Sequence, residues 1–423
     1  MTLRFLSFSS LIVLLTASIL PIRAIAGSNQ IPVLSPQEQQ ILREFDQFRR
    51  TASPTELETT PTTGDIVAFQ AQLKQMKQTV MLHTMVTDQE VNLILVTPDR
   101  IIARKVAVSR QELNRAILEF RNALQAPNSD AKSPGQKLYG WLIRPIEKEL
   151  SEAKAQTILY SPNSTLRYVP LAALYDGKQW LVERYGVNNI IGATLTKFDA
   201  QRQPLRVLAA ASTGEATVRI GDRTERFPPL MYTKSEVEAI ANLVPNTTVL
   251  LDQAFSREAL LAQIGSHNVV HLATNAKFSP NTPEDSLILL GNGDHITFKD
   301  LQNWNLTNVD LLVLSSCDTA IGGVRGDGTE ILSFAYMAQQ AGVKAVLGSL
   351  WAVDDRGTQI LMSQFYGSLA QGATKTDSLR QAQLAMIQRE RTKGIGTAEV
   401  PQTKKQLSHP FYWAAFVLAG NGL

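Results

Sequence analysis

From about residue 136 onward, short apolar segments alternate with helical patterns, and this alternation restricts the possible folds more than any other feature of the chain. The apolar segments are RVLAAAS (206–212), TVLLD (248–252), NVVHLAT (268–274), VDLLVLSSC (309–317) and AVLGSLW (345–351). Helical patterns separate them, at 233–244, 256–264 and about 330–340. Because the strands are short, apolar and joined by helices, we predict an α/β fold with a mostly parallel sheet that carries helices on both faces.

The end of the chain departs from this alternation, and the departure predicts the direction of the last strand. Two helical patterns in a row, at about 357–370 and 376–391, separate AVLGSLW from the final apolar segment, FYWAAFVLAG (411–420). One helix returns the chain across the sheet and the second carries it back. We therefore expect the last strand to run antiparallel to its neighbours.

Upstream of residue 136 the pattern predicts a smaller β-rich part. Residues 27–64 are polar and rich in Thr, Pro and Ser, which indicates a linker, with one short helix after Ser35-Pro36. Within 65–135, three β-rich segments separated by turn residues predict a meander: TVMLHTMV (79–86), VNLILVT (91–97) and RIIARKVAV (100–108). Capping boxes predict two helix starts, at Ser109 with Glu112 and at Thr233 with Glu236. No repeat of a helical solenoid is present in the sequence.

The first 26 residues have the pattern of a secretory signal. Arg4 precedes an apolar stretch at 5–20, and Ala24-Ile25-Ala26 gives a small-x-small cleavage site. A membrane span needs about 20 apolar residues, so this stretch is short for one. We predict cleavage after Ala26 and a secreted or periplasmic protein. The alternative is an uncleaved anchor, which Arg23 close to the cut favours, and only then would the chain contact a membrane.

Composition excludes several classes of function. The 423 residues carry 41 basic and 38 acidic side chains without a basic run, so we expect no nucleic-acid partner. One cysteine, Cys317, allows no internal disulfide. The glycine-rich stretch GGVRGDG (322–328) lacks the Gly-Lys-Ser/Thr of a phosphate loop, so it does not predict a nucleotide site. We expect neither a cofactor nor a metal ion.

Three strand ends carry residues that could do chemistry. The strand VVHLAT ends at Asn275, LLVLSS ends at Cys317, and VLGSLW leads into Asp354 and Asp355. Ligands of open parallel sheets bind at the carboxyl ends of the strands. If these strands are neighbours, an amide, a thiol and two carboxylates meet at one rim of the sheet.

Five segments in order resemble the CHAT family of caspase-like and separase-like cysteine peptidases, which is common in bacteria. They are LRYVPLAALYDGKQWLVERYG (166–186), VVHLATNAKF (269–278), LLVLSSCDTA (311–320), AGVKAVLGSLWAVDD (341–355) and HPFYWAAFVLAG (409–420). The resemblance covers 136–423, and 65–135 fits as the N-terminal part of the same region. It implies a caspase-like fold, and it differs from many relatives in lacking upstream helical repeats.

The resemblance assigns the nucleophile position to Cys317 and the position of the catalytic histidine to Asn275, with Ala276 in place of a glycine. A cysteine peptidase must deprotonate its thiol and protonate the leaving amine. An amide cannot carry that proton, and an unassisted thiol is only about 3% thiolate at pH 7. Loss of the acid–base group costs about 10²–10⁴ in rate. We therefore expect weak or no peptide hydrolysis.

The remaining histidines are His83, His267, His271, His295 and His409. His271 lies on the strand of Asn275, but about 13 Å deeper at 3.3 Å per residue, so we interpret it as a core residue. His267 begins that strand, at its opposite end, and His83 lies in the meander. His409 would share the rim with Cys317 if the last strand is antiparallel. It could be a substitute base, or it could bond loop backbone.

Asp354 and Asp355 also have two interpretations. They could form an acidic pocket for a basic side chain, as the resemblance to separase-like relatives implies, or they could cap the helix that follows. We interpret 322–328 as a mobile loop over the cleft, with Arg325 as a possible cleavage site within it.

The leading hypothesis is a degenerate peptidase, or pseudoenzyme, that binds basic peptide segments of a protein partner. The alternative is an active cysteine endopeptidase, cutting after basic residues with an unusual base such as His409. A third possibility is a structural partner that uses only its folded surface.

Overall fold

The computed structural model describes residues 35–49, 62–191, 196, 198, 203–220, 223–277, 286–318, 329–391 and 407–423. The predicted signal segment at 1–26 lies outside these ranges, as does the glycine-rich stretch at 322–328 with Arg325. Among the described residues, no helix combines the length and the apolar character needed to cross a bilayer.

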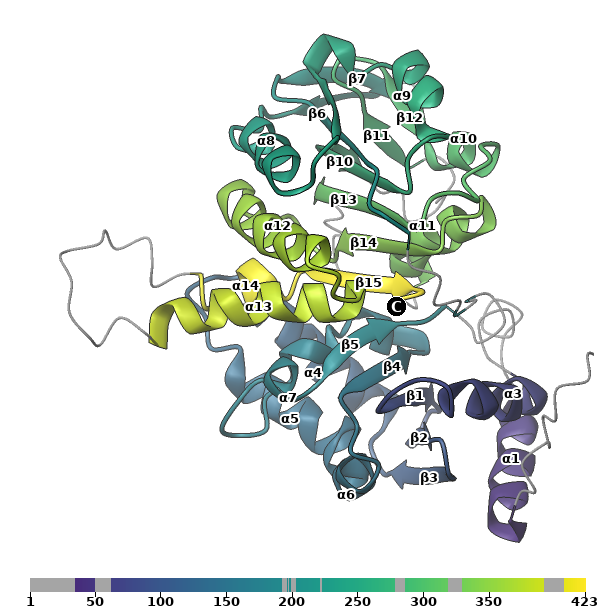
Figure 1. The fold of residues 1–423 in the computed structure, drawn as a ribbon. Helices are drawn as coiled ribbons and strands as arrows, with labels where there is room; N and C mark the ends of the chain where they lie inside the picture. Colours follow the sequence, from purple (N-terminus) through teal and green to yellow (C-terminus); the bar gives the residue numbers. More distant parts are fainter. Residues whose placement is uncertain are drawn as a thin grey trace, which may run out of the picture.

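Thirteen strands of the described chain form one sheet at the centre of the molecule (Figure 1). Its main path is β12–β11–β10–β13–β14–β15–β5–β4–β1–β2–β3, and β6 pairs with β10 and with β9. The bounds are β1 Thr79–Val86, β2 Val91–Val96, β3 Ile101–Val106, β4 Thr157–Ser161, β5 Gly186–Asn189, β6 Val207–Ala211, β9 Thr248–Leu251, β10 Val269–Lys277, β11 Leu287–Leu289, β12 His295–Thr297, β13 Leu311–Asp318, β14 Ala345–Ser349 and β15 Phe416–Gly420. A separate hairpin joins β7 (Ala216–Ile220) to β8 (Arg223–Phe227).

The sheet consists of two blocks of parallel strands that run in opposite directions. In one block, β9, β6, β10, β13 and β14 are parallel. In the other, β15, β5, β4 and β1 are parallel. The blocks meet where β15 runs antiparallel to β14, from Ala345 paired with Gly420 to Ser349 paired with Phe416. The predicted mostly parallel sheet is therefore confirmed. The predicted antiparallel direction of the last strand is confirmed toward β14 but is wrong toward β5, with which β15 runs parallel.

The predicted start of that last strand, at Phe411, is wrong. Pro410–Trp413 form the short helix α14, and β15 begins only at Phe416. Pro410 occupies the first turn of α14, where its missing N–H sacrifices no helical hydrogen bond, and the His409 side chain caps the helix. Local cap chemistry outweighs the β propensity of the aromatic residues here.

The predicted meander is confirmed, and it extends the main sheet. β2 pairs antiparallel with both β1 and β3, while β1 pairs in parallel with β4. Helix α4 (Arg110–Leu124) follows and begins where predicted: the Ser109 side chain caps it by accepting from the N–H of Glu112, which is one of the two bonds of the predicted capping box. In the polar linker, the short helix is confirmed as α1 (Pro36–Arg49). Helix α3 (Thr63–Leu73) was not predicted, although Thr62 and Asp65 form a capping box.

Helices cover both faces of the sheet, as Figure 1 shows, and each face has its own apolar core. On one face lie α4, α5 (Lys132–Leu142), α6 (Glu147–Glu152), α7 (Leu181–Arg184), α8 (Thr233–Leu243), α12 (Asp355–Ala370) and α13 (Lys375–Arg391). On the other face lie α9 (Arg257–Ile264), α10 (Phe298–Gln302) and α11 (Thr329–Gln340), and farther along the sheet α1 and α3.

His83 is a buried polar group within the core that α1 and α3 cover. Its Nδ1 lies 2.9 Å from the Ser161 hydroxyl on the neighbouring strand, and its ring stands edge-on to Phe45 of α1. Burial, with a further contribution from the charge of Arg167, lowers the pKa of His83 to about 3. The ring is therefore neutral in the folded protein at pH 7.

This lowered pKa predicts a loss of stability in acid. Because the unfolded chain takes up a proton near pH 6.5 and the folded chain only near 3, the contribution of His83 is complete above pH 6.5. It is lost as the pH falls from 6.5 to 3, at about 1.4 kcal/mol per pH unit. In urea unfolding at a series of pH values, His83→Gln should show a flatter dependence than wild type across this window. Parallel curves for the two proteins would contradict the prediction.

Candidate active site

The register of β10 and β13 brings together the two positions that the sequence singled out. The strands are parallel neighbours, with Asn275 opposite Ser316 and Ala276 opposite Cys317. Neighbouring strands lie about 4.8 Å apart, so the backbones at Asn275 and Cys317 are close. The side chain of Cys317 lies outside the described part of the structure. Both positions are at the carboxyl ends of their strands, where ligands of parallel sheets bind.

Asn275 is held by a specific hydrogen bond. Its side-chain amide donates to the carbonyl oxygen of Pro228 over 2.9 Å, and only 8% of the residue is exposed. The pairing of β10 with β13 is irregular between Leu272 and Asn275, as at a β-bulge, and bulges often redirect side chains beside active sites. The Asn275 amide therefore ties the segment before α8 to the end of β10.

His271 lies in the core, as predicted. Its Nε2 is 2.8 Å from the carboxylate of Glu236, its Nδ1 is 3.2 Å from the Tyr366 hydroxyl, and all three residues are buried. Both ring nitrogens thus face partners from α8 and α12. This arrangement joins β10 to the two helices above it and leaves no ring nitrogen for a substrate.

The predicted capping box at Thr233 is wrong, and the correction explains the partner of His271. Tyr232 occupies the N-cap position of α8 and makes no side-chain cap bond. The Thr233 hydroxyl donates instead to the Ser212 carbonyl, and Glu236 turns inward to His271. Helical spacing could have predicted this burial. Glu236 shares a face of α8 with the apolar Val237 and Ile240, and a buried carboxylate needs a polar partner.

His409 has both ring nitrogens in local bonds. Nδ1 accepts from the N–H of Phe411 at 3.1 Å, and Nε2 is 3.1 Å from the carbonyl oxygen of Ser129. Since a carbonyl only accepts, Nε2 carries the ring proton. Burial lowers the pKa of His409, partly opposed by the Ser129 bond and the charge of Asp130. These contacts fit a helix cap rather than a free base.

The other two histidines also have local partners. His267, just before β10, contacts the carbonyl of Gln263 and the hydroxyl of Thr248. His295 lies at the start of β12, 3.8 Å from Asp294. Within the described residues, no group of three or more His, Cys, Asp or Glu side chains could hold a metal ion.

The two aspartates after β14 have different surroundings. Asp354 caps α12, because its Oδ1 accepts from the N–H of Gly357 at 2.6 Å, and the residue is otherwise exposed. Asp355 turns toward α8, where its Oδ2 accepts from the N–H of Tyr232 at 2.7 Å. Burial raises the pKa of Asp355, helped by the charges of Glu236 and Asp354 and opposed by backbone N–H groups. Asp354 is therefore the one with a carboxylate oxygen open to a ligand.

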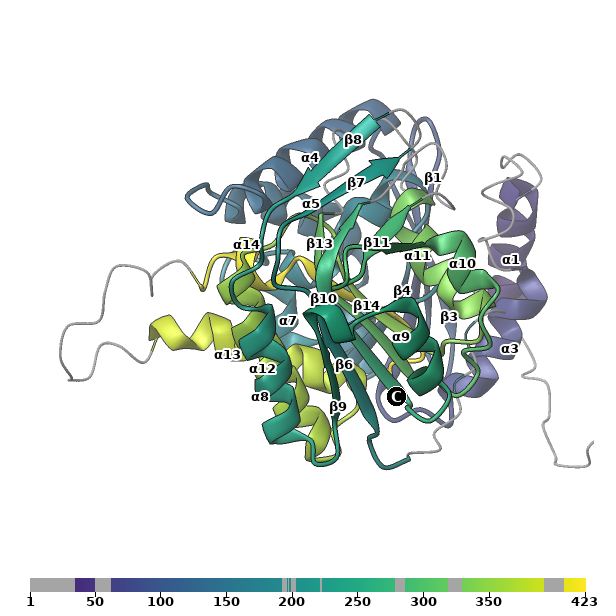
Figure 2. The ribbon, with the colours of Figure 1, turned by 90° about the horizontal axis from the view of Figure 1, so that it is seen from above.

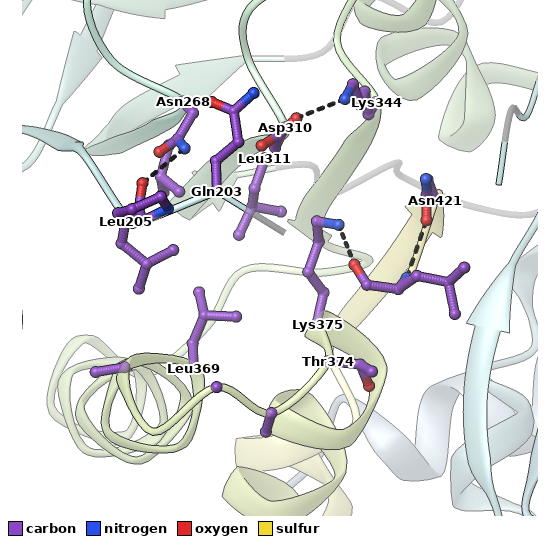
Figure 3. Close-up of a pocket in the computed structure, with 16 residues that line it drawn as sticks. Gln203, Leu205, Asn268, Asp310, Leu311, Lys344, Leu369, Thr374, Lys375 and Asn421 are labelled. Carbon is purple, nitrogen blue, oxygen red and sulfur yellow. Dashed lines mark hydrogen bonds and ion pairs between the residues drawn. The ribbon is translucent and has the colours of Figure 1, made fainter. Parts of the chain in front are cut away.

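A well-formed cavity lies at the opposite rim of the sheet. It has a volume of about 510 Å³ and is lined by residues that precede β6, β10, β13 and β14, by the α12–α13 turn and by the C-terminal residues (Figure 3). Lys344 pairs with Asp310 at its edge, and Lys375 contacts the Leu423 carbonyl. Because the cavity faces the amino ends of the strands, it is separate from the rim of Asn275.

Comparison with known proteins relates the fold of this chain to that of solved structures. Separase of Saccharomyces cerevisiae, in its complex with securin, superposes with a TM-score of 0.53 over 85% of this chain and 31% of that chain, at 11% identity. The Arg-specific cysteine proteinase gingipain R gives a TM-score of 0.42 and 8% identity, over 74% of each chain. Tetratricopeptide repeat protein 28 is 24% identical over 347 residues in Mus musculus and over 349 in Homo sapiens. These matches take in 70% of this chain but only 13% of each relative's length.

The arrangement of strands and helices is thus the caspase-like α/β fold of cysteine peptidases such as separase. The family model of the CHAT domain matches residues 132–421, and the chain belongs to the CHAT domain family. The resemblance expected from the five sequence segments is confirmed.

The buried pair of Glu236 and His271 predicts a large effect on stability. Glu236→Ala leaves His271 without its partner in the core and should lower the free energy of unfolding by about 3 kcal/mol. Glu238→Ala is the matched control, since this exposed residue of the same helix makes only a surface pair with Lys234 and should change stability by about 0.5 kcal/mol or less. Urea unfolding at pH 7 measures both. Equal effects of the two variants would contradict the assigned role of the pair.

Proposed function

We propose that this CHAT domain is a degenerate peptidase that binds basic peptide segments and hydrolyses them weakly or not at all. The observation that carries the proposal is the bond from the Asn275 amide to the Pro228 carbonyl. Through this bond the side chain acts as a clamp beside β13, at the position that the sequence resemblance assigns to the catalytic histidine. The N-terminal pattern supports a secreted or periplasmic location for this activity.

Proton transfer is the step that fails in this arrangement. Thiolate attack on a peptide carbonyl forms the S–C bond, and the C–N bond breaks only as the leaving nitrogen gains a proton. The Asn275 amide has no titratable proton to exchange, and His271 and His409 have their nitrogens engaged elsewhere. Among the described side chains, neither Asn275 nor these two histidines would offer a bound peptide a base or an acid at the Cys317 position.

The orienting partner of a catalytic histidine is nevertheless in place. In histidine-dependent sites the second ring nitrogen is usually bonded to a carbonyl or carboxylate, which sets the tautomer. The Pro228 carbonyl already accepts from the side chain at 275. A histidine there could donate Nδ1–H to the same oxygen and present Nε2 on its other side. One substitution could thus restore the missing chemistry.

Recognition of basic segments is proposed for Asp354. Its exposed carboxylate stands at the start of α12, on the rim where β14 ends. Asp355 contributes negative charge nearby but uses Oδ2 on the backbone of Tyr232. A guanidinium or ammonium group could reach the open oxygen of Asp354 without displacing the helix cap.

Asn275→His should raise the rate at which an arginyl chloromethylketone labels Cys317 by about 10²–10⁴, because it adds the missing base. Mass spectrometry of the labelled protein gives the rate. Asn275→Gln, which keeps an amide, should show no gain, and Cys317→Ala in either background should remove labelling. Wild-type labelling as fast as that of Asn275→His would show that a base is already present and would overturn the proposal.

Asp354→Asn should weaken the binding of an arginine-containing peptide by about tenfold, the cost of one charge-assisted hydrogen bond. Asparagine is as good an N-cap as aspartate, so the stability of α12 should be preserved. Fluorescence anisotropy with a labelled peptide library measures the affinity. Asp377→Asn is the control, since it removes an exposed carboxylate from the first turn of α13 at the opposite rim. Equal affinities for all three proteins would exclude Asp354 from recognition.

A further inference from the structure

The sheet has three edge strands in the described chain, and two of them, β3 and β12, have features that protect them against pairing with a strand of another molecule. At β3, the N–H of Ile101 donates to Glu38 of α1, and the Ala103 carbonyl accepts from Arg104. Lys105 adds a charge on the same strand. At β12, which has only three residues, the His295 carbonyl accepts from Arg257. Charged side chains and short strands are common protections against edge-to-edge pairing.

The third edge, β9, is also short, with four residues, but none of its own side chains is charged. It pairs only with β6, on one side, from Leu208 opposite Thr248 to Ala211 opposite Leu251. Its sequence, TVLL, contains no charge and no proline and has high β propensity. Among the described residues, no side chain forms a hydrogen bond to its main chain. Alternate N–H and C=O groups on the outer side are therefore free to pair with another strand.

Exposed apolar side chains gather around this edge. Six large hydrophobic residues of the described chain are notably exposed, and three belong to β9 and its flanking helices: Val249 at 39%, Leu243 of α8 at 39% and Leu261 of α9 at 43%. Figure 2, which looks onto this edge, shows α8 on one side of β9 and α9 on the other. Single exposed hydrophobics are ordinary, but a group along one bare edge indicates an interaction surface.

We propose that β9 pairs antiparallel with β9 of a second copy of this chain, so that the two sheets become one. Charge selects this occupant. β9 has no acidic residue, so the basic peptides proposed for the cleft would find no partner there, whereas a second β9 strand is itself uncharged and brings no like charges onto the ladder. Antiparallel pairing also sets Asp252, at the end of one β9, near the uncharged Asn246 and Thr247 of the copy rather than near another carboxylate.

The geometry of such a pair is self-complementary. A two-fold axis perpendicular to the sheet keeps each face on its own side, so α8 lies beside α8 of the copy and α9 beside its counterpart. Leu243 and Leu261 then extend the contact on the two faces, while β9 supplies main-chain hydrogen bonds in the middle. The carboxyl-end rims of the two copies stay outside the interface, because β9 pairs along its length.

Sedimentation velocity of the purified full chain over a wide range of concentration tests this interface. We expect a reversible monomer–dimer equilibrium. Val249→Lys places a charge on the edge strand and should raise the dissociation constant by about tenfold or more. Leu261→Lys, on the surface of α9, should weaken the dimer independently. Leu118→Lys is the matched control, because this residue of α4 is 42% exposed and distant in the fold.

Thermal unfolding of each variant establishes that the substitutions leave the fold intact, as expected for exposed positions. A wild-type chain that is monomeric at every concentration would overturn the proposal. So would a dimer that persists unchanged in both Val249→Lys and Leu261→Lys. A dimer weakened by Leu118→Lys to the same degree would place the interface elsewhere and equally overturn it.

Discussion

The antiparallel pairing of β14 with β15 is the interaction on which the rest of the molecule depends, because it joins two blocks of strands that run in opposite directions. The ladder ends at Gly420, whose φ of +105° and crowded site admit no side chain: a Cβ would lie 2.4 Å from the Lys344 carbonyl. The Asn188 amide of β5 donates to the Gly420 carbonyl, and Thr376 of α13 donates its N–H to Gly422. The C-terminal residues therefore connect β5 of one block, and β14 of the other, to helix α13.

This junction also determines which strand ends and which helix meet at the candidate active site. With β14 at the centre, the carboxyl ends of β10 and β13 and the start of α12 meet at one rim, beside the start of β15. The polar side chains there mostly stabilise the fold. Asn275 donates to the Pro228 carbonyl before α8, Asp355 accepts from the N–H of Tyr232 at the start of α8, and Asp354 caps α12. Of these three side chains, Asp354 alone is exposed.

Periodicity in the sequence was enough to predict the parallel sheet and the meander, because those features follow from which faces are apolar. The two consecutive helices before β15 predicted its direction relative to β14, but not its parallel pairing with β5. Periodicity was not enough where a polar residue had two possible partners. Glu236 could cap its own helix or bond His271, and the choice depends on β10, which is close only in the folded chain. The sequence also could not identify the Pro228 carbonyl as the partner of Asn275, since every residue carries a backbone carbonyl. Asn275 was thus found by pattern, but its partner required the fold.

An asparagine at 275 is a physically coherent replacement for a histidine. Both side chains carry an N–H that can donate to the Pro228 carbonyl, so the segment before α8 keeps its anchor. An asparagine lacks only the titratable nitrogen that proton transfer would need. A small apolar residue would instead have left that carbonyl without its donor in a mostly buried setting and cost about 1–3 kcal/mol. Asn275 therefore provides the anchor for the segment before α8 without a group that could carry a proton.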